Sequence, residues 1–506
     1  MKLSELLQGL ECEIVQKGFE CEITSLTSDS RKVTENGVFI CITGAVSDGH
    51  KYIPQVIQKK AGVIVIQDSA LGNDETASLI KEIPSDITIV KAQNTRLALA
   101  VMSANYFGNP AKKLFTIGIT GTKGKTTTTY MVKNVLDACG IKTGLIGTIE
   151  TIIGDEHTSA CNTTPESYDI HKSFAKMAEQ GCKAVVMEVS SQGLKLDRTA
   201  GIMFDIGVFT NLEPDHIGPN EHASFEEYLE CKAKLFSQCK VGIVNADDEH
   251  TPKILEHATC SIESYGISDK ADIRAKNITL FHEPGKIGLS YDCEGLVNMP
   301  VTLKLPGKFS VYNSLCAIAV TRHFNVDKDT LEKMLYEVKV KGRIEIVPVS
   351  DRFTLMIDYA HNAMALKSIL ETLKEYNPNR LVCLFGCGGN RSKERRFEMG
   401  EVSGKLADLT IITSDNPRFE EPLDIIEDIK TGISKTTGKH VDIPDRKEAI
   451  KYAIKNAQNG DIIVLAGKGH EDYQEIKGVK YPMDERVLIK EVVKELRRLS
   501  QEELAK

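Results

Sequence analysis

Several features that define other protein classes are missing from this sequence of 506 residues. No run approaches the ~18 consecutive apolar residues that a membrane-spanning helix needs. The opening stretch MKLSELLQGLECEIV has acidic residues inside a short apolar pattern and no cleavage-site signature, which is not typical of a signal peptide. We therefore expect a cytoplasmic chain with no membrane partner.

Cysteine pairs and excess positive charge are also absent. The 13 cysteines are scattered, and no two of them are spaced C-x-x-C, so we expect reduced thiols and neither a zinc site nor a disulfide framework. The formal net charge of −8 argues against a protein that coats nucleic acid. What is present is an ordinary globular composition, with 41% hydrophobic and 26% charged residues.

The length and the pattern of apolar runs predict an α/β fold of three domains. In the first segment, strand-like runs precede a helical pattern at 94–108, which Asn109 and Pro110 end. In the second and third segments, buried apolar runs alternate with helical patterns, as in parallel sheets covered by helices. The predicted parts are a small N-terminal α/β domain, a central parallel-sheet domain and a Rossmann-like doubly wound domain, at 1–110, 111–340 and 341–506.

The stretch GITGTKGKTT at 118–127 lies between a predicted strand and a predicted helix that begins near Lys125. It differs from the strict phosphate loop because Ile119 stands where a glycine is expected. Closely spaced glycines still let backbone N–H groups and the helix N-terminus surround phosphate oxygens. The alternative is a glycine-rich turn without a ligand. We predict nucleotide binding, with Lys125 on the β- and γ-phosphates and the Thr126 hydroxyl on magnesium; the loop residues are Gly121, Thr122, Lys123, Gly124, Lys125, Thr126 and Thr127.

Glu188 and His216 each follow a predicted buried strand. A buried glutamate is costly without a cation, so a magnesium site near the phosphate loop is expected. For His216 the alternative is a hydrogen-bonded loop residue.

The helical segment FEEYLECKAKLF at 225–236 places Lys232 on the same stripe as Tyr228 and Phe236, while Lys234 points away. Lys232 is then either a lysine that snorkels at the edge of the core or a functional lysine held inside the site.

Four motifs together resemble the Mur ligases, a family of ATP-dependent amide ligases that also includes folylpolyglutamate synthases. They are the loop G-x-x-G-T-x-G-K-T-T, EVSS beginning at Glu188, N-L-x-x-D-H ending at His216, and CKAKLF, which matches the family segment A-K-x-x-L-F. The resemblance implies that Glu188 and His216 serve magnesium. It also implies that Lys232 is carbamylated (N6-carboxylysine) and helps to hold a second magnesium ion.

The resemblance extends to nucleotide contacts and to a mechanism. Arg343 in KGRIEIV and Asp358 in MIDYAHN match elements that close on the nucleotide, and Asn313 in LPGKFSVYNSLCA is expected near the adenine. ATP would phosphorylate a substrate carboxylate to an acyl phosphate, which an amine attacks. The catalytic residues would be Lys125, Glu188, His216 and Lys232.

The N-terminal segment LTSDSRKVTENGVFICITGAVSDGHKYI resembles the UDP-binding domain of ligases that act on UDP-N-acetylmuramoyl-dipeptide, a domain that folylpolyglutamate synthases lack. The resemblance implies binding of UDP-MurNAc-L-Ala-D-Glu by a monomeric enzyme. The alternative for any one of these Ser and Thr residues is simple turn formation. The implied contacts are Ser30, Asn162, Thr163, Thr164, Ser190 and Arg198.

Two observations disagree about the incoming amine. DNPR together with GHEDY resembles the members that add meso-2,6-diaminopimelate, whereas DHIGPNEHASFEEY resembles a variant found among Gram-positive ligases, including lysine-adding ones. We favour diaminopimelate, because arginines clamp carboxylates and Glu471 can pair a distal ammonium. L-lysine remains an alternative amine. An alternative function is a phosphate-loop ATPase that acts as a switch. The alternative role for Arg418 is that it only caps a turn or pairs with Glu420 or Glu421. The expected amine-site residues are Arg391, Asp415, Asn416, Pro417, Arg418, Gly467 and Glu471.

Overall fold

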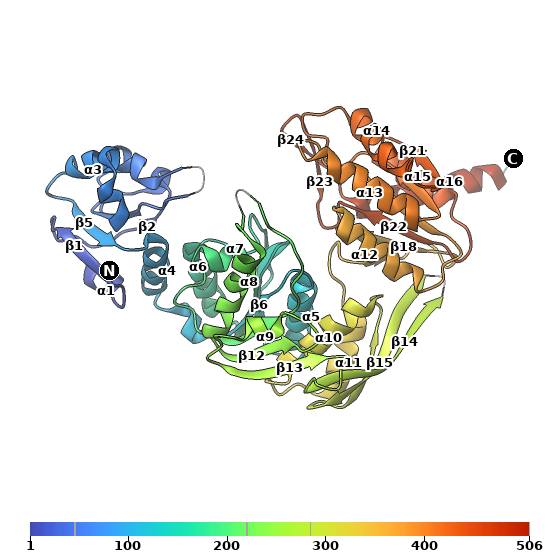
Figure 1. Ribbon diagram of the computed structural model, residues 1–506, viewed down its shortest axis with the longest axis horizontal. Helices are drawn as coiled ribbons and strands as arrows, with labels where there is room; N and C mark the ends of the chain where they lie inside the picture. The colour runs from blue at the N-terminus through green and yellow to red at the C-terminus, as the bar shows by residue number, and fades with distance from the viewer. Residues whose placement is uncertain (45–46, 219–220, 284, 505–506) are drawn as a thin grey trace. The chain divides into compact units, whose positions relative to one another are not determined.

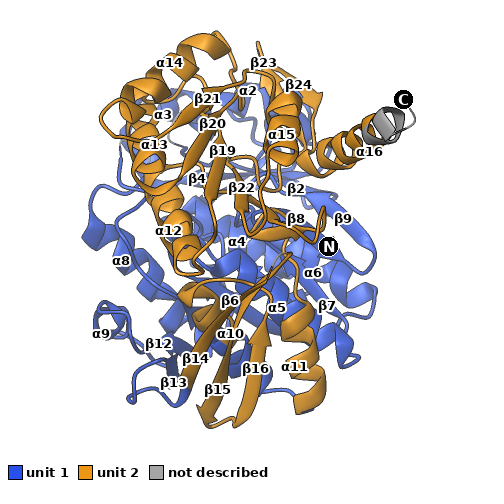
Figure 2. Ribbon diagram, turned by 90° about the vertical axis from the view of Figure 1, so that its right-hand side faces the viewer, with its two compact units in different colours: residues 1–274, 315–327 blue, residues 275–314, 328–506 orange. Residues whose placement is uncertain are grey.

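A computed structural model describes residues 1–44, 47–218, 221–283 and 285–504 (Figure 1). The chain divides into two compact units, residues 1–274 with 315–327 and residues 275–314 with 328–506 (Figure 2). The predicted α/β class is confirmed in both units.

Unit 1 begins with a five-stranded sheet in the order β1-β5-β4-β3-β2. Strands β2 to β5 run parallel and β1 pairs antiparallel with β5. Separate apolar clusters cover the two faces of the sheet, because successive residues of a buried strand point to opposite sides. The strands are β1 (Cys12–Gln16), β2 (Leu26–Thr27), β3 (Val38–Ile40), β4 (Val63–Gln67) and β5 (Thr88–Ala92), and the helices are α1 (Leu3–Leu6), α2 (Ile53–Gln58), α3 (Asp74–Lys81) and α4 (Thr95–Tyr106).

The second sheet of unit 1 has the order β13-β12-β11-β6-β10-β7-β8-β9, and Ile273 and Arg274 at the start of β14 extend its β13 edge. Strands β7, β10, β6, β11, β12 and β13 are parallel, as predicted, while β8 and β9 form an antiparallel edge. Its strands are β6 (Phe115–Thr120), β7 (Thr143–Ile146), β8 (Glu150–Ile153), β9 (Glu156–Ser159), β10 (Ala184–Glu188), β11 (Phe204–Phe209), β12 (Cys239–Asn245) and β13 (Ser261–Gly266). Its helices are α5 (Lys125–Ala138), α6 (Ser167–Glu179), α7 (Ser191–Lys195), α8 (Phe225–Ala233) and α9 (Thr251–Ile254).

Unit 2 contains a six-stranded sheet in the order β17-β18-β22-β19-β20-β21, parallel except for β17. Helices α12 to α14 lie on one face, and α15 and α16 lie on the other (Figure 2). This is the doubly wound arrangement predicted for the C-terminal segment. Its strands are β17 (Glu345–Val347), β18 (Thr354–Asp358), β19 (Leu381–Phe385), β20 (Leu409–Ile412), β21 (His440–Asp442) and β22 (Ile462–Ala466), and its helices are α12 (Ala363–Lys374), α13 (Lys393–Leu406), α14 (Pro422–Ile433), α15 (Arg446–Lys455) and α16 (Glu485–Leu504).

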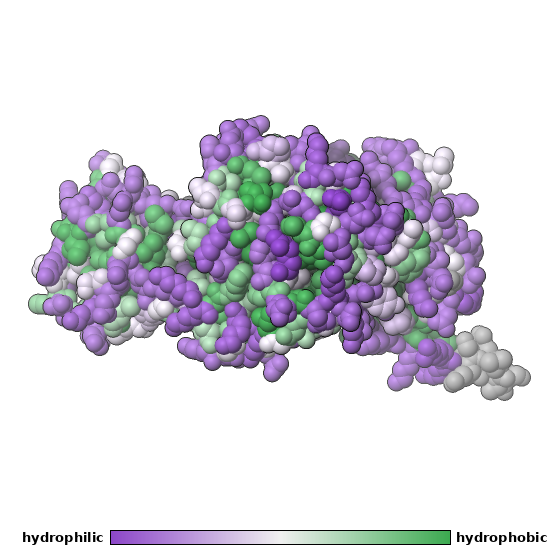
Figure 3. Space-filling model, turned by 90° about the horizontal axis from the view of Figure 1, so that it is seen from below, coloured by the Kyte–Doolittle hydropathy of each residue, from purple (hydrophilic) through white to green (hydrophobic). Residues whose placement is uncertain are grey.

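Two smaller parts complete unit 2. Strands β14 (Ile273–Glu283), β15 (Lys286–Gly295) and β16 (Met299–Leu303) are neighbours in a sheet that contacts α11 (Lys328–Glu337), and α10 (Lys308–Thr321) spans residues of both units. The hairpin of β23 (Tyr473–Ile476) and β24 (Val479–Pro482) follows β22. No helix among the described residues is both long and apolar enough to cross a bilayer. The surface drawn in Figure 3 is mainly hydrophilic, with hydrophobic residues in small patches.

Candidate active site

The phosphate loop lies at the carboxyl end of β6, in the middle of the second sheet of unit 1. Gly121 has a φ of +146°, and a Cβ built there would lie 1.9 Å from Thr210 Oγ1. Gly124, with a φ of +86°, directly precedes α5. A larger residue at position 121 would clash with the Thr210 side chain and would be strained at this φ, which favours glycine there.

The end of β11 fixes the conformation of this loop. Asn211 Oδ1 accepts a hydrogen bond from Lys123 N at 2.9 Å, and Asn211 Nδ2 donates to Lys123 O at 3.0 Å. Thr122 N donates to Asn211 O at 2.8 Å, and the Thr122 hydroxyl lies 2.9 Å from the Tyr228 hydroxyl. Lys125 Nζ lies over the loop and donates to Gly121 O at 2.8 Å and to Thr122 O at 3.1 Å.

Glu188 ends β10 beside the first turn of α5 and is 1% exposed. Its Oε2 accepts hydrogen bonds from the hydroxyls of Thr126 at 3.1 Å and Thr148 at 3.0 Å, and its Oε1 accepts one from Thr148 N at 2.8 Å. A buried carboxylate bonded to a hydroxyl at a phosphate loop offers the oxygen ligands that magnesium prefers. The Thr126 and Glu188 side chains therefore fit a magnesium ion.

His216 lies apart from this pair. It has a φ of +54°, its side chain is half-exposed, and its Nδ1 lies 3.1 Å from Glu221 Oε1. No hydrogen bond or ion pair joins it to Glu188 in the part of the chain described, and no group of three His, Cys, Asp or Glu side chains there is arranged for a metal. Its predicted role on magnesium stays a prediction.

Lys232 lies inside the molecule. The residue is 1% exposed, its Nζ donates to Gly121 O at 2.8 Å, and the ammonium lies 4.5 Å from the centre of the Tyr228 ring. Burial, with a smaller contribution from Lys125, holds the pKa of Lys232 well below its ordinary value. Lys234, in contrast, is exposed, as the stripe predicts. Snorkelling does not describe Lys232, because its charged end does not reach solvent.

Four of the residues predicted for the muramoyl-peptide surround the end of β10. The Thr164 hydroxyl donates to Glu188 O at 2.9 Å, and Thr163 Oγ1 lies 3.0 Å from Thr148 Oγ1. Ser190 caps α7 by accepting from Gly193 N at 3.0 Å. Arg198 Nη1 donates to Thr164 O at 2.8 Å.

The other two residues of this predicted set are placed differently. Asn162 is exposed, one residue before Thr163. Ser30 lies in the N-terminal sheet region, where its hydroxyl donates to Gln55 Oε1 at 2.9 Å. No hydrogen bond joins Ser30 to the residues near β10 in the part of the chain described, and its role stays a prediction.

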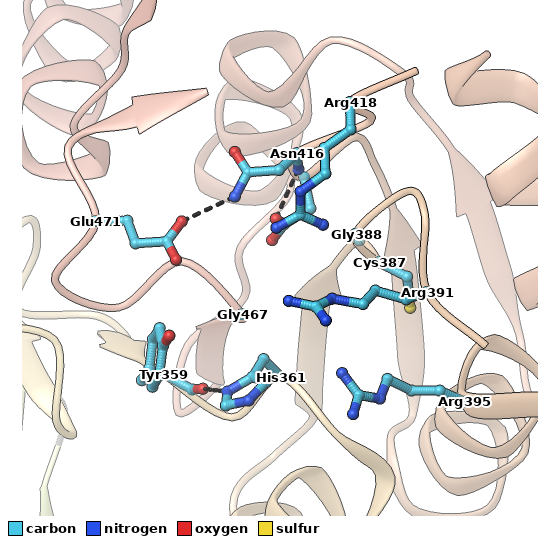
Figure 4. A pocket seen from close by; sticks show the side chains of 12 residues that line it. Tyr359, His361, Cys387, Gly388, Arg391, Arg395, Asn416, Arg418, Gly467 and Glu471 are labelled. Carbon is cyan, nitrogen blue, oxygen red and sulfur yellow. Dashed lines mark hydrogen bonds between the residues drawn. The ribbon is translucent and has the colours of Figure 1, made fainter. Parts of the chain in front are cut away.

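Unit 2 holds a pocket of about 130 Å³ at the carboxyl ends of β18, β19, β20 and β22 (Figure 4). Six of the seven residues expected at the amine site line it, and Pro417 does not. Strand ends of a doubly wound sheet are where ligands are expected. The lining residues are Tyr359, His361, Gly386, Cys387, Gly388, Arg391, Arg395, Asp415, Asn416, Arg418, Gly467 and Glu471.

Arg418 is held at one end of this pocket. It has a φ of +51°, its Nη1 donates to Gly389 O at 2.8 Å, and its Nε lies 3.1 Å from Glu475 Oε2. Glu420 is instead bonded by Arg396, at 2.8 Å. Arg418 therefore forms its ion pair with Glu475 of β23, and not with Glu420.

Two other arginines point into the pocket, Arg391 from the loop before α13 and Arg395 from the first turn of that helix. Arg391 and Arg395 extend toward the same space near His361 (Figure 4), and neither forms an ion pair with any residue that the structure describes. Unpaired guanidinium groups beside a cavity are suited to a carboxylate ligand. Desolvation, assisted by Arg395 and Arg343, lowers the pKa of His361.

The predicted nucleotide residues of unit 2 lie close to this pocket or in α10. Asp358 Oδ2 accepts from Ile344 N and its Oδ1 from Ala360 N, both at 2.9 Å, and burial raises the pKa of its carboxyl while Arg343 opposes that rise. The Arg343 guanidinium lies 4.8 Å from the centre of the Tyr359 ring. Asn313 is buried in α10.

Family models match three ranges of the chain. The Mur ligase family catalytic domain matches residues 22–107, the Mur ligase middle domain residues 119–321, and the Mur ligase glutamate ligase domain residues 342–469. Relatives of more than 40% identity match over almost the whole chain. The chain belongs to the Mur ligase family.

The relatives reported below, and one solved structure, carry the name of the same ligase. A "UDP-N-acetylmuramoyl-L-alanyl-D-glutamate--2,6-diaminopimelate ligase 1" of Clostridium acetobutylicum is 41% identical over 98% of this chain and 100% of its own. The corresponding ligase of Caldanaerobacter subterraneus subsp. tengcongensis is 43% identical over 98% of this chain and 99% of its own. A solved structure of a ligase with that substrate name has a TM-score of 0.68 and 28% identity, and covers 94% of this chain and 95% of its own.

Four residues at the sites of this Mur ligase were not anticipated from the sequence. Thr148 bonds Glu188, His222 is fully buried with its Nε2 2.9 Å from Ser191 Oγ, Arg395 lines the pocket, and Lys468 bonds Glu471. Arg395 could have been found from the same segment, GCGGNRSKERR, because it follows Arg391 by four residues in the first turn of α13. The other three carry no local signal, since only the fold brings them to their partners.

Proposed function

We propose that this Mur ligase joins meso-2,6-diaminopimelate to the D-glutamate carboxylate of UDP-MurNAc-L-Ala-D-Glu, with conversion of ATP to ADP and phosphate. The observation that carries the proposal is the pocket of unit 2, where Arg391, Arg395 and Arg418 meet Asn416 and Glu471. Three guanidinium groups and the carboxylates of Asp415 and Glu471 suit an amino acid with two carboxylates and a second amine. The names of the relatives support the same substrate pair.

The phosphate loop supplies the activation step of the proposed reaction. Backbone N–H groups of residues 121–124 and the start of α5 would surround the phosphates of ATP, and Lys125 would move from the loop carbonyls to the β- and γ-phosphates. Asn313, Arg343 and Asp358 would contact the adenine, phosphate and ribose. Thr126 and Glu188 would hold magnesium, helped by His216 and carbamylated Lys232, and the ion would neutralise phosphate charge.

The γ-phosphoryl group then passes to the D-glutamate carboxylate and gives an acyl phosphate. The free amine of diaminopimelate attacks the carbonyl carbon, and phosphate leaves from the tetrahedral intermediate. Arg391 and Arg395 would hold the carboxylate next to the attacking amine, which orients that amine.

The remaining assignments belong to the same proposal. UDP-MurNAc-L-Ala-D-Glu would be bound by Ser30, Asn162, Thr163, Thr164, Ser190 and Arg198. The three domains would be residues 1–110, 111–340 and 341–506, in an enzyme that works as a monomer. A reaction that consumes ATP and a nucleotide-linked sugar implies a cytoplasmic location.

L-lysine remains a second candidate amine, because it also carries the reacting amine and its neighbouring carboxylate. The sequence DHIGPNEHASFEEY is the observation that favours it. The arrangement of Arg418 in the pocket favours diaminopimelate, since lysine has no distal carboxylate.

The deciding assay incubates purified protein with UDP-MurNAc-L-Ala-D-Glu, ATP and magnesium, and with diaminopimelate or L-lysine in parallel. Phosphate release and product mass are measured. We expect product with diaminopimelate and little with lysine. Product with lysine alone would overturn the amino-acid assignment, and ATP hydrolysis without either product would favour the ATPase switch.

A further inference from the structure

Helix α7 has only five residues, yet residues on both sides of it are predicted to bind the muramoyl-peptide. Ser190 caps its start, and Arg198 follows its end, where Arg198 N donates to Gly193 O at 2.9 Å. A helix of about one turn gains little stability from its own hydrogen bonds. The positions of Ser190 and Arg198 therefore depend on what holds α7 to its neighbours.

Helix α8 lies beside α7 (Figure 1), and side-chain links join the two at both ends of α7. At the end of α7, Lys195 Nζ lies 2.9 Å from Glu227 Oε1 of α8. At its start, Ser191 Oγ lies 2.9 Å from Nε2 of His222, which precedes α8 by three residues. Lys195 and Glu227 are partly exposed, whereas Ser191 and His222 are buried. The link at the start of α7 is therefore the one that water does not weaken.

The imidazole of His222 is enclosed, and its bonding is incomplete. The residue has no exposed surface, and Nδ1 has no hydrogen-bond partner in the part of the chain that the structure describes. Glu227 Oε2 lies 3.7 Å from Nδ1, which favours the tautomer with its proton on Nδ1 and leaves Nε2 to accept from the Ser191 hydroxyl. Burying such a ring costs free energy that an apolar ring of similar size would not cost. The bond to Ser191 therefore points to a role beyond packing.

The surroundings of His222 are tied to the proposed nucleotide site. Its N donates to His216 O at 3.0 Å, and its ring packs on that of Tyr228 with 5.2 Å between ring centres. The Tyr228 hydroxyl in turn lies 2.9 Å from Thr122 Oγ1 of the phosphate loop. The bond from His222 to Ser191 thus connects α7 to a framework that is already fixed.

We propose that His222 is a positioning residue for the muramoyl-peptide, which through Ser191 fixes the first turn of α7 so that Ser190 and Arg198 face the substrate. The inference rests on the proposed function, which supplies the substrate of those two residues. His222 acts through Ser191 and not by touching the substrate, because its ring is enclosed. The expected defect on its loss is weaker binding of UDP-MurNAc-L-Ala-D-Glu, with the binding of diaminopimelate to unit 2 unchanged.

Two substitutions of this histidine separate the contributions of its two nitrogens. In His222→Gln the amide can reach the position of Nε2, whereas in His222→Asn the shorter amide reaches only that of Nδ1. kcat, the KM values for UDP-MurNAc-L-Ala-D-Glu and diaminopimelate, and thermal midpoints are measured. We expect His222→Asn to raise the KM for UDP-MurNAc-L-Ala-D-Glu about tenfold, as the loss of one buried hydrogen bond predicts. His222→Gln should stay within about threefold of the unaltered enzyme, because the bond to Ser191 can re-form.

Ser191→Ala removes the other half of the same bond. Alone it should raise the KM for UDP-MurNAc-L-Ala-D-Glu about tenfold, and combined with His222→Asn it should add nothing further, because both changes break one interaction. His250→Asn is the matched control. The ring of His250 packs on Phe225 of the same helix α8, with 5.1 Å between ring centres. We expect this control to keep both KM values, whatever its effect on the thermal midpoint.

Equal KM values for UDP-MurNAc-L-Ala-D-Glu in the Gln and Asn variants, or a lower thermal midpoint with no change in KM, would overturn the proposal. Full additivity in the double variant would do the same. If His222→Asn does not fold, the KM of Ser191→Ala decides. Failure of the proposed function has a separate sign, since the unaltered enzyme would then form no product. Calorimetric titration with UDP-MurNAc-L-Ala-D-Glu then gives Kd in place of KM, and no binding by the unaltered protein would exclude both proposals.

Discussion

Lys232 is the residue whose surroundings differ most from those of its type, because lysines are rarely buried. Lys232→Met keeps most of the side-chain volume and removes the nitrogen that bonds Gly121 O. If that nitrogen carries the carbamate, kcat should fall by roughly 100-fold or more, the usual loss when a group that stabilises transition-state charge is removed. Steady-state kinetics with and without added bicarbonate measure this effect. Lys234→Met, on the exposed side of the same turn, should stay near the unaltered rate, and an active Lys232→Met enzyme would exclude the assigned role.

Arg418 is the residue expected to separate diaminopimelate from lysine. In Arg418→Met the distal carboxylate loses its charged donors, which should cost about 2–3 kcal/mol and lower kcat/KM for diaminopimelate on the order of 100-fold. Activity with lysine, which has no such carboxylate, should change little. Parallel kinetics with the two amino acids measure the difference. Similar losses with both would mean that Arg418 only shapes the loop through Gly389 and Glu475.

Single residues also show how far the sequence could predict the site. The buried position of Lys232 followed from helical spacing, and that of Glu188 followed from a strand end, because both depend on local periodicity. The position of His216 could not be derived, since its contact with Glu221 depends on the conformation of a loop. Lys468 gave no signal either, because its partners Asn416 and Glu471 come from different strand ends and meet only in the folded sheet.

Among the elements, the phosphate loop depends most strictly on glycine. Gly121→Ala would place a methyl group 1.9 Å from Thr210 Oγ1 at a φ of +146°, so the Thr210 side chain or the loop must move. We expect ATP affinity to fall at least 100-fold, because the backbone N–H groups would no longer point toward one phosphate position. Titration with a fluorescent ATP analogue measures this loss. Gly72→Ala is the control, since a Cβ there meets nothing within 4 Å, and unchanged ATP binding by Gly121→Ala would contradict the proposed site.

Helix α6 contains a histidine that should make unit 1 sensitive to acid. His171 is 1% exposed, neither ring nitrogen has a hydrogen-bond partner, and burial lowers its pKa to about 4. The unfolded chain takes up this proton near pH 6.5, so the stabilisation is complete above that pH and is lost as the pH falls toward 4. The loss should be about 3 kcal/mol.

Urea unfolding of unit 1 at several pH values, followed by circular dichroism, measures this dependence. His171→Leu should be less sensitive between pH 6.5 and 4, because no proton is taken up at that position. His257→Leu, at an exposed position, should behave like the unaltered protein. An equal dependence in all three proteins would exclude His171 as the cause.

Element prediction succeeded where strands are buried on both faces. The parallel strands β6, β10, β11 and β12 of unit 1 and β18, β19, β20 and β22 of unit 2 followed from continuous apolar runs. Strands β9 and β14 were not anticipated, because β9 is exposed along its whole length and β14 mixes buried and exposed residues. Such segments pair through neighbours that the sequence alone does not identify.

At the scale of the whole molecule, the two compact units have separate apolar cores. Units with their own cores can unfold in separate steps, so we expect more than one calorimetric transition. The His171→Leu variant identifies the transition of unit 1, because only that transition should change its dependence on pH.

All residues that line the pocket proposed for diaminopimelate belong to unit 2. A ligand that binds only the folded form of unit 2 should therefore raise the transition of that unit alone. At about 100 times its Kd the added stability is about 2.7 kcal/mol, which corresponds to a rise of several degrees in Tm for a unit of this size. Differential scanning calorimetry of the full chain with and without diaminopimelate measures the shift. Arg418→Met should abolish it, and an equal shift of both transitions would mean that the amino acid also binds residues of unit 1.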